Sequence, residues 1–404
     1  MTAVHEITDT EGTQFDLTAL LAPISPETFR AEYWERQPLL VRRDDPGHYD
    51  GFLTLDDIDA MISMAGAALS DVMVVSDGKT WKPGELAQGG RDALTNSLAA
   101  LYERYRAGST VVLNYAHDRW EPLQRSARRL GTELGALVRM NIYLTPPGSR
   151  GFKPHYDRHD VFVVQVHGSK QWQLGDPPYE LPLHELPFGF AQEGTTLDRE
   201  IELNAGDLLY LPRGTLHTAA TGASASAHVT LGVHPVIWGH VLADAVQDII
   251  LTDARFRGGL PAGFTRDDAL RDQVGQTFAE LVEVLRERLT PHELTARAAH
   301  RATSNGSPAL RHQLLDLERA ATLDADTPVR RRPDTRSLLT ETAAGPVLRV
   351  HHKAIPLSAP AVRVVRHAES AAAEWFSAAA ISDGSADYLD AIRTLVSDGF
   401  LTLH

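Results

Sequence analysis

The segments PHYD (154–157) and GDLLYLPRGTLH (206–217) carry most of the information about the fold of this chain. Residues at positions i and i+2 of an extended segment share one face, so His155 and Asp157 can approach one point from the end of a strand. His217 lies 62 residues after His155 and must reach that point from another strand. Two imidazoles and one carboxylate form a ligand set that holds one face of Fe(II) and leaves other positions open. The spacing therefore predicts a metal site of His155, Asp157 and His217.

The sequence around these segments predicts a β-rich core. From about residue 137 the hydrophobic period changes from 3.6 to 2, and turns containing Gly, Pro or Asn separate short strands: VRMNIYL, DVFVVQVHG, KQWQLG, REIELNAGD, LLYLP and HVTLGVHP. Closely spaced short strands are typical of a barrel or a double-sheet jelly roll. In a jelly roll, strands that are distant in the sequence line one mouth, where the three ligands would meet.

Helical patterns precede and follow this core. Before it we expect helices after the capping residues Ser25 and Thr54 and over 92–106 and 121–135, with short strands at 39–43 and 109–115. After it we expect helices over 240–250, 268–289, 291–302, 308–321, 369–379 and 385–398, a linker at 324–333, and strands at 347–352 and in the terminal GFLTLH. A helix followed by a short terminal strand is typical of a winged helix.

The fold class expected is therefore α+β: a jelly roll with N-terminal helices, a helical region and a winged-helix-like tail. The predicted domains are 1–239, the jelly-roll domain with its N-terminal α/β extension, 240–328, the helical region, and 329–404, the tail.

Composition excludes several classes of protein. The 404 residues include no Cys, which excludes disulfides, thiolate catalysis and cysteine metal sites. No apolar run reaches membrane-spanning length, and the acidic, polar N-terminus lacks the features of a signal peptide, so we expect a cytoplasmic protein. The net charge of −14 argues against nucleic-acid binding. This charge is compatible with a basic protein or peptide as substrate. It is equally compatible with a role in keeping the protein soluble and nothing more.

Three further residues are candidates for binding a small molecule. Lys170 shares a strand face with Trp172 and Leu174, and a lysine on an apolar face is costly unless it meets an anion, such as the distal carboxylate of 2-oxoglutarate. The alternative is that Lys170 lies at the turn and extends its ammonium to solvent. Asn141 and Tyr143 share the polar face of VRMNIYL, which either lines the site or faces solvent.

The other histidines near the motifs are interpreted more simply. His159 would share the face of His155 and Asp157 in a regular strand, and it is interpreted as a neighbour of the ligands rather than a rival ligand. The remaining histidines of the region are expected to be structural: His167, His184, His228 and His234.

The two motif segments have a known counterpart. GFKPHYDRHDVFVVQVHGSKQWQL and GDLLYLPRGTLH resemble the JmjC-type ribosomal oxygenases, also grouped as the cupin-4 family. The pattern Gly206-x5-Pro212-x-Gly214-x2-His217 matches the second motif of the cupin superfamily, and SPETFRAEYWERQPLLVRR is similar to the opening segment of the oxygenase family. The resemblance runs from about residue 25 to residue 240.

This resemblance implies an Fe(II)- and 2-oxoglutarate-dependent dioxygenase that uses O₂ to hydroxylate protein side chains. The side chains that the resemblance favours are arginine and histidine of ribosomal proteins. The resemblance also implies a homodimer formed through the helical region. Carried over by position, His155, Asp157 and His217 would bind iron. Lys170 would bind the 2-oxoglutarate carboxylate with Asn141 nearby, and Tyr143 would face the substrate. The chain departs from the classical cupin pattern in having HxD in place of HxH, which fits iron oxygenases, and Thr221 in place of Asn.

Other functions stay open at this point. The substrate could be another peptide, such as a natural-product precursor. A cupin metalloenzyme that does not use 2-oxoglutarate would keep the three ligands and be indifferent to Lys170→Ala. A non-catalytic binding protein would use the jelly roll as a scaffold. In that case the scattered basic residues of the tail favour a protein contact over DNA.

The helix predicted over 268–289 has an apolar stripe that would pack on its own chain or on a second subunit. The stripe consists of Val274, Phe278, Leu281, Val282 and Leu285.

Overall fold

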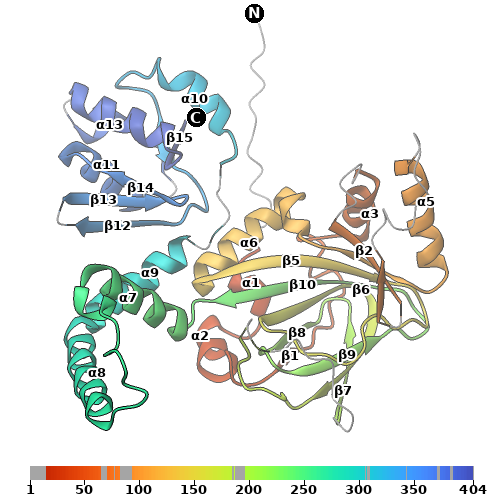
Figure 1. Ribbon diagram of the computed structural model, residues 1–404. Coiled ribbons are helices and arrows are strands. Elements are labelled where there is room, and N and C mark those ends of the chain that lie inside the picture. Colours follow the sequence, from red (N-terminus) through yellow and green to blue (C-terminus); the bar gives the residue numbers. More distant parts are fainter. Residues whose placement is uncertain are drawn as a thin grey trace, which may run out of the picture. The chain divides into compact units, whose positions relative to one another are not determined.

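The chain folds into two compact units, Met1–His234 and Pro235–His404, seen in a computed structural model (Figure 1). The structure describes residues 15–64, 71–76, 78–81, 93–183, 186, 196–304, 306, 310–342, 344–370, 374–382 and 385–403. Each unit has its own hydrophobic core and is described by itself.

Short capped helices open the first unit. Helix α1 (Leu17–Leu21) begins after Asp16, whose carboxylate accepts a hydrogen bond from the Ala19 amide, and α2 (Pro26–Thr28) begins after Ser25, whose hydroxyl accepts one from the Thr28 amide. The helix predicted after Ser25 continues as a π-helical turn, Phe29–Tyr33. The other helices of this part are α3 (Leu55–Met64), α5 (Ala93–Arg106) and α6 (Glu121–Leu134). They confirm the helical patterns of the sequence.

The large sheet of the first unit has the strand order β1-β8-β6-β10-β5-β4-β2-β3, with β7 and β9 paired to β6 outside this path. The strands are β1 (Leu39–Val41), β2 (Val72–Ser76), β3 (Lys79–Trp81), β4 (Thr110–Leu113), β5 (Ala136–Thr145), β6 (Asp160–Gly175), β7 (Arg199–Asn204), β8 (Leu208–Leu211), β9 (Leu216–Ala220) and β10 (Ser226–Pro235). Strands β2 and β3 were not predicted. The order places strands distant in sequence side by side, and the expected α+β jelly roll is confirmed.

Strand β6 is the element that joins the two sheets of the jelly roll. Its first half pairs with β8 and β10, and its second half pairs with β7 and β9. The sequence predicted two strands here, separated at the HGS turn. The structure instead has one strand that bends at Gly168, whose φ of 62° is open to glycine without strain. The bend allows one strand to serve both sheets.

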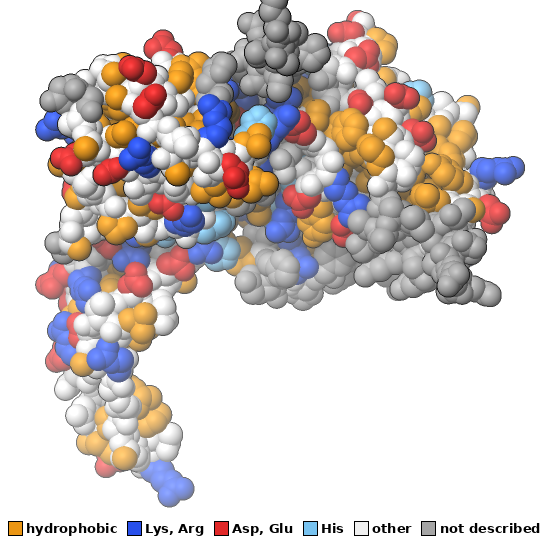
Figure 2. All heavy atoms as spheres, turned by 90° about the horizontal axis from the view of Figure 1, so that it is seen from above, with side chains coloured by type: hydrophobic (Ala, Val, Ile, Leu, Met, Phe, Trp, Pro, Cys, Tyr) orange, Lys and Arg blue, Asp and Glu red, His pale blue; other side chains and the backbone are white. Residues whose placement is uncertain are grey.

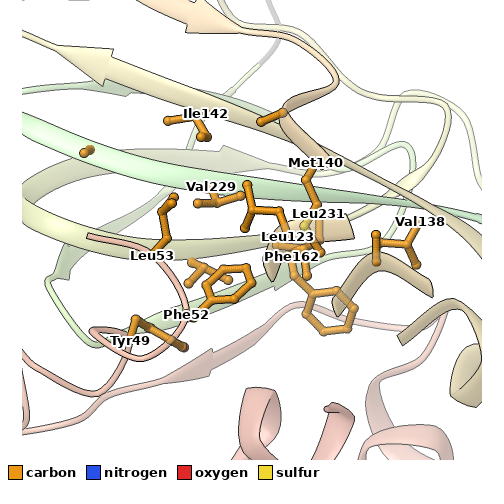
Figure 3. Close-up of a cluster of buried hydrophobic side chains, with 14 of the residues drawn as sticks. Tyr49, Phe52, Leu53, Leu123, Val138, Met140, Ile142, Phe162, Val229 and Leu231 are labelled. Carbon is orange, nitrogen blue, oxygen red and sulfur yellow. The ribbon is translucent and has the colours of Figure 1, made fainter. Parts of the chain in front are cut away.

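The two faces of β6 enter different apolar clusters. Phe162 and Val164 belong to the large cluster between the sheet and the N-terminal helices, part of which is drawn in Figure 3 with Phe52, Met140 and Leu231. The smaller cluster lies inside the jelly roll and consists of Val161, Val163, Trp172, Leu174, Leu203, Leu209 and Leu211. Burial on both faces explains why the first half of β6 reads as an uninterrupted apolar run.

The second unit is mostly helical. Its helices are α7 (Trp238–Thr252), α8 (Asp268–Arg288), α9 (Pro291–Ser304), α10 (Gln313–Ala320), α11 (Ala359–Ser370), α12 (Ala378–Ile381) and α13 (Ala386–Ser397). Strands β12 (Ser337–Thr342), β13 (Gly345–Val350) and β14 (Lys353–Pro356) form one antiparallel sheet, and β11 (Val329–Arg331) pairs with the C-terminal β15 (Leu401–Leu403). Among the described residues, no helix is both long and apolar enough to cross a membrane.

Two predictions for the second unit are wrong. The helix predicted over 369–379 is not continuous: α11 buries Ala361, Val364, Val365 and Ala368 and ends at Ser370, and α12 begins at Ala378. Residues 371–373 of the predicted helix lie outside the described residues. Phe376, inside the predicted helix, forms an isolated bridge with Val329. The predicted linker at 324–333 contains β11, a three-residue strand whose only sequence signal is one apolar residue followed by arginines. The partners that decide these segments lie 47 residues apart for Phe376 and Val329 and 74 residues apart for Val329 and Leu403, so no local pattern indicates them.

Candidate metal centre

The structure brings His155, Asp157 and His217 together. One possible ligand atom from each residue lies within 4.8 Å of the other two. The cause is backbone pairing, because His155 and His217 form an isolated antiparallel bridge with N···O distances of 3.0 and 2.8 Å. Asp157 follows two residues after His155, and its carboxylate Oδ2 lies 3.6 Å from Nε2 of His217. His155 and Asp157 precede β6, and His217 lies in β9.

Backbone carbonyls orient both imidazoles in the same way. Nδ1 of His155 lies 2.9 Å from the Lys153 carbonyl oxygen, and Nδ1 of His217 lies 2.9 Å from that of Thr215. A carbonyl oxygen only accepts hydrogen bonds, so Nδ1 carries the proton in both rings. The Nε2 atoms then have free lone pairs, which is the tautomer that binds a metal.

The charges at this group also suit a cation. Burial, together with the neighbouring His155, lowers the pKa of His217 to about 4, so this imidazole is neutral at pH 7. Burial tends to raise the pKa of Asp157, but the imidazoles of His159, His217 and His155 outweigh it and hold the pKa below its usual range. A neutral His217 beside an ionised Asp157 has the protonation states that a metal ion requires of its ligands.

Two glycines shape the loop that delivers His217. Gly206, with φ of 94°, begins the turn into β8, and Gly214, with φ of 92°, ends the bend after it. A Cβ on Gly214 would lie 2.4 Å from the Tyr179 carbonyl oxygen, so the neighbouring segment leaves room only for glycine. The Gly214 amide donates to the Asp157 carbonyl oxygen at 2.9 Å, which ties the second motif to the first.

Lys170 lies on the buried face of β6, as predicted. Its side chain is 4% exposed and lies on the same face as Trp172 and Leu174, so the alternative in which it reaches solvent is wrong. Nζ donates to the Thr145 hydroxyl at 2.9 Å. Burial lowers the pKa of Lys170 to about 7, and no carboxylate of the described residues opposes the shift. An ammonium in this position is stabilised by an anionic ligand.

Two further buried polar atoms lie near Lys170 without a hydrogen-bond partner. They are Nε1 of Trp172 and Nδ1 of His228. The two rings contact each other with centroids 5.6 Å apart, and the Trp172 ring lies 5.9 Å from that of His217. An unpaired buried donor or acceptor costs about 1–3 kcal/mol. A polar ligand bound between Lys170 and the candidate metal ligands His155 and His217 would give these two ring nitrogens hydrogen-bond partners.

Tyr143 and Asn141 lie beside this group on β5. The Tyr143 ring stacks on His228 with centroids 4.8 Å apart, and its edge meets Phe152, which in turn contacts His155. Burial raises the pKa of Tyr143 to about 12. The Asn141 side chain accepts a hydrogen bond from the Tyr115 amide at 3.0 Å. Both residues are half-buried rather than on an open face.

Thr145 and His228 lie beside the site, although neither was predicted from the sequence to do so. Thr145, the partner of Lys170, follows Tyr143 by two positions, so extending the polar face of β5 would have found it. His228 was expected to be structural, yet it lies between Tyr143 and Trp172. His159 packs on His234 and lies outside the ligand group. His167 is exposed, and His184 lies outside the described residues.

The site and fold match known proteins. The family described as "JmjC domain" matches residues 116–240. Ribosomal oxygenase 2 of Mus musculus is 34% identical over 253 residues, covering 60% of this chain and 53% of that protein. Ribosomal oxygenase 1 of Rattus norvegicus is 34% identical over 322 residues, covering 74% and 52%. Residues 116–240 match the JmjC domain, and the chain is similar to ribosomal oxygenases over 60–74% of its length.

Other relatives extend this comparison. The protein named bifunctional lysine-specific demethylase and histidyl-hydroxylase NO66 of Drosophila persimilis is 30% identical over 300 residues, covering 72% of this chain and 42% of that protein. The crystal structure of Escherichia coli ycfD is 16% identical and covers 94% of this chain and 98% of its own, with a TM-score of 0.56, which shows a shared fold. The chain spans about half the length of the curated relatives it matches.

Proposed function

We propose that this protein is an Fe(II)- and 2-oxoglutarate-dependent dioxygenase that hydroxylates a protein side chain. The observation that carries the proposal is the convergence of His155, Asp157 and His217, linked through Trp172 to a buried Lys170. His155 and His217 would bind the iron through Nε2, and Asp157 through its carboxylate. Fe(II) and 2-oxoglutarate together supply the oxidation of an unactivated C–H bond by O₂, with release of CO₂ and succinate.

The surroundings of Lys170 support 2-oxoglutarate as the cosubstrate. A carboxylate at Nζ would restore the pKa of Lys170 toward its ordinary value, while the Thr145 hydroxyl keeps the ammonium in place. Asn141 would lie nearby, and Tyr143, which packs between His228 and Phe152, would face the substrate. A structure of the E. coli ribosomal oxygenase YcfD in complex with cobalt and 2-oxoglutarate shares this fold at a TM-score of 0.53. A cupin enzyme without 2-oxoglutarate would not need a cation buried here.

The proposed substrate is an arginine or histidine side chain of a ribosomal protein. The names of the relatives support this class, and the net charge of −14 suits a basic partner. Within each unit, the described acidic and basic side chains visible in Figure 2 are intermixed and form no continuous basic stripe for nucleic acid. A natural-product precursor peptide is the alternative substrate.

The first test is succinate formation from 2-oxoglutarate by the Fe(II)-loaded protein, with and without a basic ribosomal-protein fraction. Turnover that rises with the fraction and is lost in His155→Ala and in Lys170→Ala is the expected result. His167→Ala is the matched control, because His167 is an exposed histidine of the same strand as Lys170. Turnover that persists in His155→Ala would overturn the metal site. Metal-dependent turnover indifferent to Lys170→Ala would favour the cupin enzyme without 2-oxoglutarate.

A homodimer formed through the helical region is part of the proposal. Every residue of α8 is described, and only Val284 is buried, although the helix has 21 residues. Phe278 of its predicted stripe is 66% exposed and Val282 is 39% exposed. A long helix that leaves Phe278 and Val282 of its apolar stripe exposed is better explained by a second subunit than by its own chain.

The domain boundaries at 239/240 and 328/329 and the winged-helix-like tail also stay proposals. The tail has its own core, in which α11 and α13 pack with Val329, Leu348 and Leu401. Helix α13 is followed by the terminal strand β15, as the sequence predicted. We assign this module a protein or subunit contact.

A further inference from the structure

We propose that Glu35, which lies outside the 116–240 JmjC match, is a positioning residue for the metal centre and acts through Arg213 and Asp160. The inference rests on the proposed metal site. It gives a role to the opening segment SPETFRAEYWERQP, which is distant in sequence from all three ligands.

Several contacts join the two ligand-bearing segments, including the following three. The first is the backbone bridge between His155 and His217, and the second is the hydrogen bond from the Gly214 amide to the Asp157 carbonyl oxygen. The third is the ion pair between Asp160 and Arg213, with Nη1 2.9 Å from Oδ2. This third connection is an ion pair between side chains, so another part of the chain can influence it.

The ion pair is buried and highly connected. Asp160 is 0% exposed, and its Oδ1 also accepts hydrogen bonds from the Arg213 amide at 3.2 Å and from the Tyr210 hydroxyl at 3.1 Å. Asp160 lies three residues after the ligand Asp157, and Arg213 lies four residues before the ligand His217. A buried pair of this kind tolerates little displacement, because a charge that loses its partner remains desolvated.

Glu35 closes a ring of contacts around this pair. Its carboxylate forms an ion pair with the same Nη1 of Arg213, and its amide donates to the Tyr210 hydroxyl at 3.0 Å. The ring runs from Glu35 to Arg213, Asp160, Tyr210 and back to Glu35. Glu35 has a φ of 57°, a left-handed conformation that is uncommon for a residue with a side chain. The preceding Trp34 stacks on Tyr210 at 6.3 Å, which helps to hold this turn.

The ring has a consequence for metal binding. Arg213 bridges two carboxylates, and losing the charge of Glu35 leaves it held by Asp160 alone. The guanidinium and the bend at 212–214 then gain freedom, and that bend carries His217. Outer contacts that orient metal ligands typically change affinity by about 10–100-fold. Because Glu35 acts through Arg213 and not on a ligand directly, we expect the low end, about tenfold weaker binding in Glu35→Gln.

The test is Co(II) titration of the apo protein, followed by visible absorbance, for the wild type, Glu35→Gln and the control Glu32→Gln. Glu32 is an exposed carboxylate of the same segment. Urea unfolding of each apo protein accompanies the titration, because a role in stability alone would move the unfolding midpoint and leave the Co(II) affinity unchanged. Arg213→Lys keeps the charge but not the planar guanidinium, so Glu35→Gln should have a smaller effect in that background.

The outcomes are distinct. Weaker Co(II) binding in Glu35→Gln, with Glu32→Gln equal to the wild type, is the expected result. Equal Co(II) affinity in both variants and the wild type would overturn the role of Glu35 and leave the metal site intact. A wild type that binds no Co(II) would overturn the proposed function itself. If Arg213→Lys does not fold, the comparison of Glu35→Gln with Glu32→Gln still decides the question.

Discussion

At the scale of single residues, the metal centre depends on which imidazole nitrogen carries a proton. The carbonyl oxygens of Lys153 and Thr215 direct the Nδ1 protons of His155 and His217 away from the centre, and burial keeps His217 neutral. The HxD…H spacing predicted the residues but not these carbonyl partners. These partners therefore orient both imidazoles to bind a cation through Nε2.

Replacing any one of the three ligands should abolish metal binding. For His155→Ala, Asp157→Ala and His217→Ala we expect Co(II) affinity to fall by more than about 100-fold, beyond the usual effect of losing an outer contact. Isothermal titration of the apo proteins measures this, with His167→Ala as control. Full affinity in any of the three variants would remove that residue from the ligand set.

Lys170 should make the stability of the apo protein depend on pH. Its pKa is about 7 in the folded protein and 10.5 ordinarily, so between these values the unfolded chain holds the extra proton. The free energy of unfolding should therefore rise with pH from about 7 toward 10, by up to about 1.4 kcal/mol per unit. Urea unfolding at pH 7 and pH 9, compared with Lys170→Met, measures this contribution.

Ligand binding supplies a check on that prediction. With metal and 2-oxoglutarate present, the carboxylate of 2-oxoglutarate would raise the pKa of Lys170. The free energy of unfolding should then change with pH more similarly in the wild type and in Lys170→Met than it does in the apo proteins. A wild type and a Lys170→Met variant with equal slopes in the apo state would show that the lysine is not desolvated as the structure places it.

At the scale of elements, Gly168 decides the path of β6. A Cβ at Gly168 would lie 1.9 Å from the Ala225 carbonyl oxygen, whereas one at Gly148, whose φ of 64° is nearly the same, would meet nothing within 4 Å. Gly148→Ala should therefore lower the free energy of unfolding only by the cost of placing alanine in a left-handed backbone conformation, about 1–2 kcal/mol. Gly168→Ala should cost about 1–3 kcal/mol more, because the two strands must separate. Urea unfolding compares them, and equal costs would argue against this close contact.

The same element shows why strand boundaries are hard to predict. The pattern placed a turn at His167–Ser169, because Gly and Ser are typical of turns. In the structure the left-handed Gly168 bends the strand without ending it, and β10 has a register shift opposite this bend, between Ala227 and His228. The inward face of Lys170 was nevertheless predicted correctly, since alternation resumes on the far side of the bend.

At the scale of the whole molecule, the exposed Phe278 and Val282 of α8 predict self-association. Phe278→Asp should weaken the proposed dimer, because it would place a charge in an apolar interface. Sedimentation velocity over a range of concentrations measures this, with Leu314→Asp as a control. Leu314 is an equally apolar residue, 73% exposed on α10. A wild type that is monomeric at all concentrations would contradict the dimer, and equal weakening by both variants would place the contact elsewhere.

The sequence by itself determined the features that repeat locally or follow a known motif. It predicted the α+β jelly roll, most helices, the three residues that converge, and the buried face of Lys170, because periodicity and spacing record which side of an element faces the core. Only the tertiary structure decided the short β11, the place of α11, the burial of His228 beside Tyr143, and the ring through Glu35, Arg213 and Asp160. Each of these depends on partners far away in the chain, and their free energy comes from desolvation and pairing that no local pattern contains.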